Sequence, residues 1–188
     1  MYKWNNECKL DTLKVYGEND VLIFETKNEK AKVYIVNNDI EKITITVDGK
    51  EQEITKNDRK HIVVGDGNTQ RDVYHYLMPN GPTPTLRLGI TKHRGEGTWS
   101  SLPHNFELNT EPGFEEVFFY ITEGATQRGF QVGRGVWFDN SSVDGVWPIS
   151  DRTFNTVPMG YHPVVAEPGV KMSYVWAYLA KMKRWEKI

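Results

Sequence analysis

Short runs rich in apolar, β-branched and aromatic residues recur along the chain, and polar positions alternate with them at a period of two. The clearest runs cover residues 21–26, 31–36, 42–48 and 116–121, and each ends at Asn, Asp, Gly or a Glu-Lys pair. A period of two places successive side chains on opposite faces of an extended strand, where branched and aromatic side chains pack well. The pattern predicts an all-β protein.

Turn signals separate these runs. Asp48-Gly49 lies between two short strand patterns, and this dipeptide tolerates the positive φ angles of a type I′ hairpin turn. Sixteen glycines and nine prolines punctuate the chain, many of them within residues 65–170. Many short strands joined by tight turns indicate a barrel or a sandwich.

Two segments leave the type of element open. Residues 69–77 form a short run that could be a helix, and residues 174–185 could form an amphipathic helix. The second segment also fits a final strand, because Tyr174, Trp176 and Tyr178 alternate.

The chain has the length of one domain, with 188 residues and 21.7 kDa. Its composition shifts near residues 54–67, where charged sequence with few aromatic residues gives way to sequence rich in Gly, Trp and Pro. We therefore expect an N-terminal β segment over residues 1–60 and a main barrel over residues 61–188.

Charge and cysteine content disfavour several classes of binding partner and exclude some kinds of structural site. The formal net charge is −2 and no basic stripe is present, which disfavours binding to nucleic acid or to an anionic membrane surface. Cys8 is the single cysteine, so neither an internal disulfide nor a cysteine zinc site can form. The first residues lack the apolar core of a signal peptide, and the expected location is the cytoplasm.

Three of the polar residues could hold a metal. His104 precedes Glu116 by twelve residues, and His162 follows Glu116 by 46 residues. Inward-facing side chains from different strands of a barrel can meet at one level. Two imidazoles and one carboxylate would suit zinc, iron, manganese or nickel better than calcium.

Two blocks carry a family resemblance. The stretch "GTWSSLPHNFELNTEPGFEEVFFYITEGATQRGFQVGRGVW" begins at Gly97, and "VPMGYHPVVAEPGVKMSYVWAY" begins at Val157. Together they resemble the 5-deoxy-glucuronate isomerase family, cupin enzymes of inositol catabolism. The resemblance implies a cupin, a double-stranded β-helix or jelly-roll barrel. Family members are longer and contain two cupin halves, so residues 1–60 would be the shortened remnant of the first half.

The same resemblance implies a set of metal ligands. Glu116 and His162 match the glutamate and the last histidine of the family. His104 matches the first histidine if one residue is deleted after Pro103, and Phe106 then occupies the second histidine position. An ungapped alignment instead places Asn105 and Glu107 at the two histidine positions, so one imidazole is missing either way. Glu107 could replace it.

The implied activity is the interconversion of an aldose and a ketose of a deoxy uronic acid at a divalent metal. Glu107 and Glu115 are the candidate bases for the proton transfer, although alternation with Glu116 turns Glu115 out of the barrel. Arg71 and Arg128 are candidates for binding the substrate carboxylate. Trp99 and Tyr161 are candidate walls of the pocket.

The missing histidine leaves an alternative open. A cupin without a metal, or with a weakened metal site, could bind a sugar or a small carboxylate without catalysis. A third interpretation is assembly, since an uncovered edge of the first β segment could pair with another copy to form a homodimer or a higher homo-oligomer.

Overall fold

The computed structural model describes residues 1–100 and 113–180, and these residues are almost entirely strands and turns. One short 3-10 helix, Gly67–Thr69, interrupts them. The strands are β1 (Lys3–Trp4), β2 (Lys14–Glu18), β3 (Val21–Glu25), β4 (Glu29–Val36), β5 (Asp39–Val47), β6 (Lys50–Thr55), β7 (Lys60–Val64), β8 (Arg71–Leu77), β9 (Leu86–His93), β10 (Trp99–Ser100), β11 (Glu116–Gly124), β12 (Arg128–Val136), β13 (Ser142–Ser150), β14 (Thr153–Val157), β15 (Met159–Tyr161), β16 (Val164–Ala166) and β17 (Val170–Leu179).

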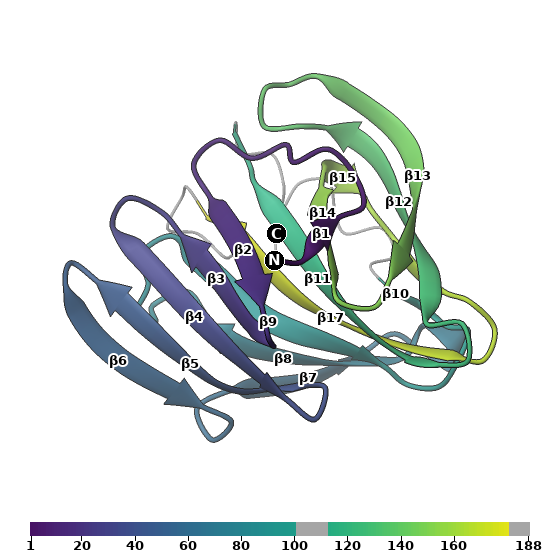
Figure 1. The fold of residues 1–188 in the computed structure, drawn as a ribbon, viewed down its shortest axis with the longest axis horizontal. Coiled ribbons are helices and arrows are strands. Elements are labelled where there is room, and N and C mark those ends of the chain that lie inside the picture. Colours follow the sequence, from purple (N-terminus) through teal and green to yellow (C-terminus); the bar gives the residue numbers. More distant parts are fainter. Residues whose placement is uncertain (101–112, 181–188) are drawn as a thin grey trace.

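These strands form three sheets (Figure 1). The largest has seven strands in the order β1-β14-β11-β17-β9-β8-β7. A smaller sheet runs β10-β16-β12-β13, with β15 also paired to β12. Strands β2 to β6 form an antiparallel meander, which appears in Figure 1 as the purple and blue layer in front of the seven-stranded sheet.

The seven-stranded sheet is the middle layer, with a hydrophobic core on each face. On β11, Val117 and Phe119 belong to the core shared with Leu22 and Phe24 of the N-terminal meander. The alternate residues of the strand face the smaller sheet, because neighbouring side chains point to opposite faces. There Phe118, Tyr120 and Tyr174 pack with Ile149 and Val164.

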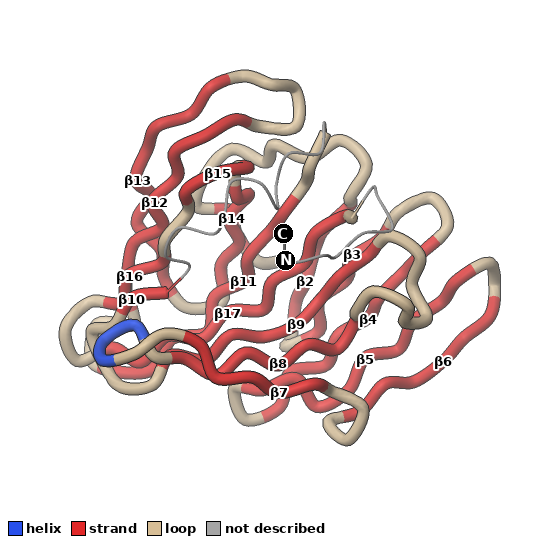
Figure 2. Tube along the Cα trace, turned by 180° about the vertical axis from the view of Figure 1, so that it is seen from behind, coloured by secondary structure: helices blue, strands red, loops and turns tan. Residues whose placement is uncertain are grey.

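The side that faces the smaller sheet is therefore the interior of a jelly roll, and Figure 2 shows β12 and β13 standing beside the larger sheet. The predicted all-β cupin fold with an additional N-terminal β segment is confirmed. The Asp48-Gly49 turn is also confirmed, since it joins β5 to β6 with φ of 47° and 77°.

Both ambiguous segments are mainly strands in the residues that the structure describes. The helix considered at residues 69–77 is wrong, because Arg71–Leu77 is β8 and pairs with both β7 and β9. For residues 174–185, the strand interpretation is correct up to Leu179. β17 lies between β11 and β9, so both of its faces pack against a hydrophobic core, and a strand with two buried faces carries a long apolar run.

The N-terminal residues take part in more than one sheet. β1 pairs in parallel with β14 and so extends the seven-stranded sheet, whereas β2 to β6 form their own meander. The boundary at residue 60, and the origin of the first segment as a remnant, stay predictions. Within the residues that the structure describes, no helix has the length and apolar character needed to cross a membrane.

Candidate metal centre

Glu116 and His162 meet in the interior of the jelly roll. Glu116 begins β11 of the seven-stranded sheet, and His162 lies between β15 and β16, both of which pair with β12 of the smaller sheet. Glu116 Oε2 is 3.7 Å from His162 Nε2, and both side chains are buried. The two sheets thus deliver one carboxylate and one imidazole to the same point.

The separation of these atoms fits a shared metal ion. Oxygen and nitrogen ligands lie about 2.0–2.2 Å from a transition metal, so two ligands of one ion are separated by roughly 3.0–3.5 Å in octahedral or tetrahedral geometry. The observed 3.7 Å between Glu116 Oε2 and His162 Nε2 needs a shift of a few tenths of an ångström. A carboxylate and an imidazole are the donors expected for zinc, iron, manganese or nickel.

The tautomer of His162 is set by its own loop. His162 Nδ1 lies 2.7 Å from the Gly160 carbonyl oxygen. Because a carbonyl oxygen only accepts, Nδ1 carries a hydrogen and donates it, and in the neutral ring Nε2 holds the lone pair that a metal needs, on the side of Glu116. This arrangement, in which the second ring nitrogen donates to a backbone carbonyl, is typical of metal-ligating histidines.

A glycine contact sets the path of the backbone that leads to His162. Gly135 of β12 pairs with Gly160 of β15, and a Cβ atom on Gly135 would lie 1.8 Å from the Met159 carbonyl oxygen. Any other residue at position 135 would push β15 away from β12. The close approach of these strands therefore depends on the absence of a side chain.

Burial dominates the electrostatics of Glu116. Desolvation raises the pKa of the Glu116 carboxyl to about 8, since the charged form loses its hydration inside the jelly roll. The Phe118 ring packs edge-on against His162 with centroids 5.9 Å apart, which keeps that side apolar. A buried carboxylate next to an imidazole lone pair is an environment that a cation would stabilise, so the residues present fit a divalent metal.

The Glu115 side chain lies on the opposite face of the seven-stranded sheet from Glu116. Its carboxylate accepts the backbone N–H groups of Asp11, Thr12 and Leu13 at 2.8–3.0 Å. The side chain is buried, and it points away from the jelly-roll interior, as alternation with Glu116 predicts. The structure thus ties Glu115 to the N-terminal segment and does not bring it to the candidate centre.

The two predicted arginines also lie away from this pair. Arg71 faces the interior but is in register with His93, six residues along β9 from the row of Glu116, a separation of roughly 20 Å. Arg128 is exposed at the far end of β12, with its Nε 3.9 Å from Glu167 Oε1. Neither guanidinium is near the Glu116 carboxylate.

The predicted wall residues occupy the outer face of the smaller sheet. Trp99 is 37% exposed and in register with Val165. Tyr161 is in register with Arg134 and precedes His162, so alternation turns its side chain away from the interior. These two aromatic residues are therefore not brought to the pair of Glu116 and His162.

The remaining predicted ligands, His104 and Glu107, lie outside the described residues. Within residues 1–100 and 113–180, no group of three His, Cys, Asp or Glu side chains has metal-binding geometry. Glu116 and His162 are thus the two predicted metal ligands that the structure describes, and it brings them together.

Arg87 is a candidate that the sequence analysis missed. Glu116 pairs with Tyr178 and Tyr178 pairs with Arg87, so the three residues form one row across β11, β17 and β9. Two strand spacings separate Glu116 from Arg87 along this row, about 10 Å. The buried guanidinium donates to the carbonyl oxygens of Thr83, Pro84 and Leu86. The signal available in the sequence is an arginine within the otherwise apolar first half of β9, "LRLGI".

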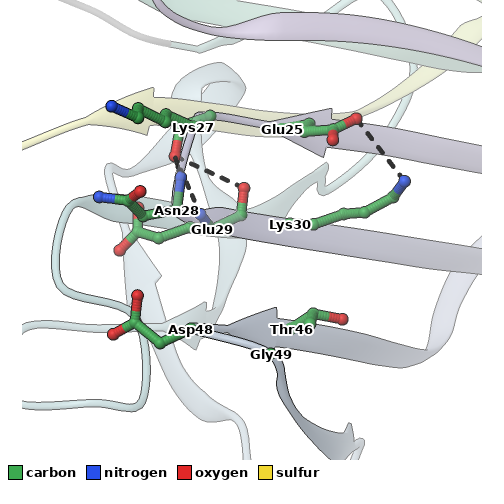
Figure 3. Close-up of a pocket in the computed structure, with 9 residues that line it drawn as sticks. Glu25, Lys27, Asn28, Glu29, Lys30, Thr46, Asp48 and Gly49 are labelled. Carbon is green, nitrogen blue, oxygen red and sulfur yellow. Dashed lines mark hydrogen bonds and ion pairs between the residues drawn. The ribbon is translucent and has the colours of Figure 1, made fainter.

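A polar depression on the N-terminal meander is a separate feature (Figure 3). It has a volume of about 320 Å³ and lies at the turns that join β3 to β4 and β5 to β6. Glu25 and Lys30 form an ion pair of 3.6 Å at its side, and the nearby Glu29 carboxylate binds the backbone N–H groups of Thr85 and Leu86. None of the predicted site residues that the structure describes lines it.

Comparisons with known proteins agree with the fold and the motifs. The sequence model of the KduI/IolB family matches residues 11–188. Two curated relatives, each named 5-deoxy-glucuronate isomerase, come from Geobacillus kaustophilus (strain HTA426) and Geobacillus thermodenitrificans (strain NG80-2). They are 32% identical over 127 residues and 31% identical over 128 residues, and each match covers 65% of this chain.

The matched part of the chain spans less than half the length of these curated relatives, since it covers 44% of each. Among solved structures, an IolB-like protein from Salmonella typhimurium LT2 shares the fold at 17% identity, with a TM-score of 0.59 over 95% of this chain and 75% of that chain. The family match runs through β2 to β17 and includes both Glu116 and His162. The chain therefore belongs to the KduI/IolB family.

Proposed function

We propose that this protein interconverts the aldose and ketose forms of a deoxy uronic acid at a divalent metal held by Glu116 and His162. The observation that carries the proposal is the approach of Glu116 Oε2 to His162 Nε2, 3.7 Å apart, from opposite sheets of a jelly roll. Membership of the KduI/IolB family and relatives named 5-deoxy-glucuronate isomerase support the reaction class.

The protein supplies donors, orientation and exclusion of water. Glu116 and His162 would hold zinc, iron, manganese or nickel, and His104 would add a third ligand. When bound, such an ion supplies Lewis-acid polarisation of the carbonyl and hydroxyl oxygens of the open-chain sugar. Phe118 closes one side of His162 and keeps bulk water from that side.

Two further roles are needed for the isomerisation. A base must move a proton between neighbouring carbons, and Glu107 is the better of the two earlier candidates because Glu115 is held by residues 11–13 on the other face. A cation must bind the substrate carboxylate, and Arg87 replaces Arg71 and Arg128 in this role because it shares the row of Glu116.

A non-enzymatic cupin that binds a sugar or a small carboxylate is the alternative. It is favoured by the single histidine in the stretch "HNFE", residues 104–107, where the family has a pair. Loss of one of four ligands weakens a metal site and alters which metal it prefers.

Metal content and isomerase activity on uronic acids distinguish the two functions. We expect about one equivalent of metal in the purified protein, loss of metal and activity in His162→Ala and Glu116→Gln, and no loss in His61→Ala. His61 is a matched control because it is an exposed histidine of β7, paired with Asp72. A wild-type protein that binds a uronic acid without metal and without turnover would instead support the binding function.

A further inference from the structure

We propose that Gln131 is a positioning residue that holds His162 in place opposite Glu116, and that Tyr120 in turn holds Gln131. The inference rests on the proposed role of His162 as a metal ligand. Gln131 and Tyr120 are not ligands. They form a buried, hydrogen-bonded link between the two sheets that carry the ligands.

The first link is between Gln131 and the backbone around His162. Gln131 is fully buried on the inner face of β12. Its Nε2 amide donates to the His162 carbonyl oxygen at 2.8 Å and to the Val132 carbonyl oxygen at 2.8 Å, with the Pro163 carbonyl oxygen at 3.2 Å. Three carbonyl oxygens only accept, so the NH₂ group must face them and the orientation of the amide is determined.

The second link is between Gln131 and the strand of Glu116. Tyr120 donates its hydroxyl hydrogen to Gln131 Oε1 at 2.6 Å, and both side chains are fully buried. Tyr120 lies on β11 with Phe118 and Glu116, and residues two apart on a strand face the same side. The chain Tyr120–Gln131–His162 therefore joins the seven-stranded sheet to the smaller sheet close to the candidate centre.

This link fixes the position of the His162 ring relative to Glu116, which contacts within the His162 loop cannot fix alone. The bond from Nδ1 to the Gly160 carbonyl oxygen orients the ring relative to its own loop. The Gln131 amide fixes the backbone of that loop relative to β12. The hydrogen bond from Tyr120 then holds β12 in a fixed position relative to β11, and so holds His162 in a fixed position relative to Glu116. Hydrogen-bond partners of metal ligands typically contribute about 10–100-fold to metal affinity.

The test compares Co²⁺ binding to four proteins, each checked to be folded by circular dichroism. Gln131→Met keeps the length of the side chain and removes the amide, and Tyr120→Phe removes one hydroxyl. Thr122→Val is the control, because it deletes a hydroxyl that bonds to the Gln127 carbonyl oxygen at the far end of the same strand. We expect the Co²⁺ dissociation constant to rise about 10–100-fold in Gln131→Met, less in Tyr120→Phe, and not at all in Thr122→Val.

A second readout does not depend on metal. The imidazole ¹H–¹⁵N spectrum of the metal-free protein, with His162 assigned by its loss in His162→Ala, should show one sharp set of His162 signals in the wild type and broadened or doubled signals in Gln131→Met, because the loop that carries the ring is no longer fixed to β12. Wild-type metal affinity and unchanged His162 signals in Gln131→Met would overturn the inference, and Tyr120→Phe serves in its place if Gln131→Met does not fold. If the wild type itself binds no Co²⁺, the proposed metal function fails, and the His162 signals alone decide whether Gln131 positions His162.

Discussion

Glu115 and Glu116 are neighbours in the chain, yet their carboxylates serve opposite faces of one sheet. Glu115 binds the backbone N–H groups of Asp11, Thr12 and Leu13, whereas Glu116 approaches His162 inside the jelly roll. The alternation of a strand produces this division, because successive side chains leave the backbone in opposite directions. Glu115 thus binds the N-terminal segment, and Glu116 supplies a carboxylate to the candidate centre.

Substituting each of the two glutamates in turn should separate stability from metal binding. We expect Glu115→Gln to lose at least about 1.5–3 kcal/mol of unfolding free energy, because its amide cannot replace a carboxylate that accepts three N–H groups. Glu116→Gln should keep or raise stability, since a desolvated carboxylate is removed, and should weaken Co²⁺ binding by more than about 100-fold. Urea unfolding and metal titration of the two variants measure both effects. Equal metal affinity in Glu116→Gln and the wild type would contradict the assignment.

Substitution of Gly135 should disturb His162 without touching it. A Cβ on Gly135 would meet the Met159 carbonyl oxygen at 1.8 Å, so Gly135→Ala should displace β15 and lower both stability and metal affinity. Gly145→Ala is a milder control on the neighbouring strand, where the added atom would lie 3.2 Å from the movable Trp147 ring. Thermal unfolding and Co²⁺ titration should rank Gly135→Ala as the more damaging change. The reverse order would show that β15 can move without cost.

Acid should destabilise the protein through buried histidines. Burial, with a smaller contribution from Arg71, lowers the pKa of His93 to about 3, and its ring nitrogens lie 3.0 Å from Thr98 Oγ1 and 2.6 Å from Ser100 Oγ. Between about pH 6.5 and pH 3, His93 is protonated in the unfolded chain but stays neutral in the folded protein. This contribution to stability is therefore complete above pH 6.5 and falls with pH, by up to about 1.4 kcal/mol per pH unit.

The measurement is urea unfolding across this pH range for the wild type and for His93→Gln. The variant should be less stable at neutral pH but should lose less stability as the pH falls. His75 adds to the slope in both proteins, because burial lowers its pKa to about 4. Parallel curves for the two proteins would show that His93 is not the group that titrates.

Arg87 should decide the affinity for an acidic substrate. Arg87→Lys keeps a positive charge but loses the paired geometry of the guanidinium, so we expect KM for a uronic acid to rise by roughly 10- to 100-fold. KM for a neutral aldose should change little, which separates binding of the carboxylate from a general defect of the Thr83–Leu86 turn. Arg128→Lys is the control, since Arg128 is exposed at the far end of β12. An effect in Arg128→Lys alone would restore the earlier candidate.

Local pattern predicted the strands at residues 21–26, 31–36, 42–48 and 116–121 and the all-β class, but it did not identify β8, which was considered as a helix. The period of two, the Asp-Gly turn and the spacing of glycine and proline follow from backbone geometry, which acts between neighbouring residues. The ambiguity at residues 174–185 had a physical cause as well. A central strand buried on both faces carries an apolar run that resembles a buried helix.

The family blocks in the sequence also singled out Glu116 and His162, and alternation correctly turned Glu115 to the other face. Which arginine shares a row with Glu116 could not be read from the sequence, because register across β11, β17 and β9 brings together residues far apart in the chain. The links from Tyr120 to Gln131 and from Gln131 to His162 likewise exist only once two sheets face each other. The sequence by itself determined the all-β class, the faces of the strands whose residues alternate, and the candidate ligands, while long-range pairing of the sheets decided which polar groups meet.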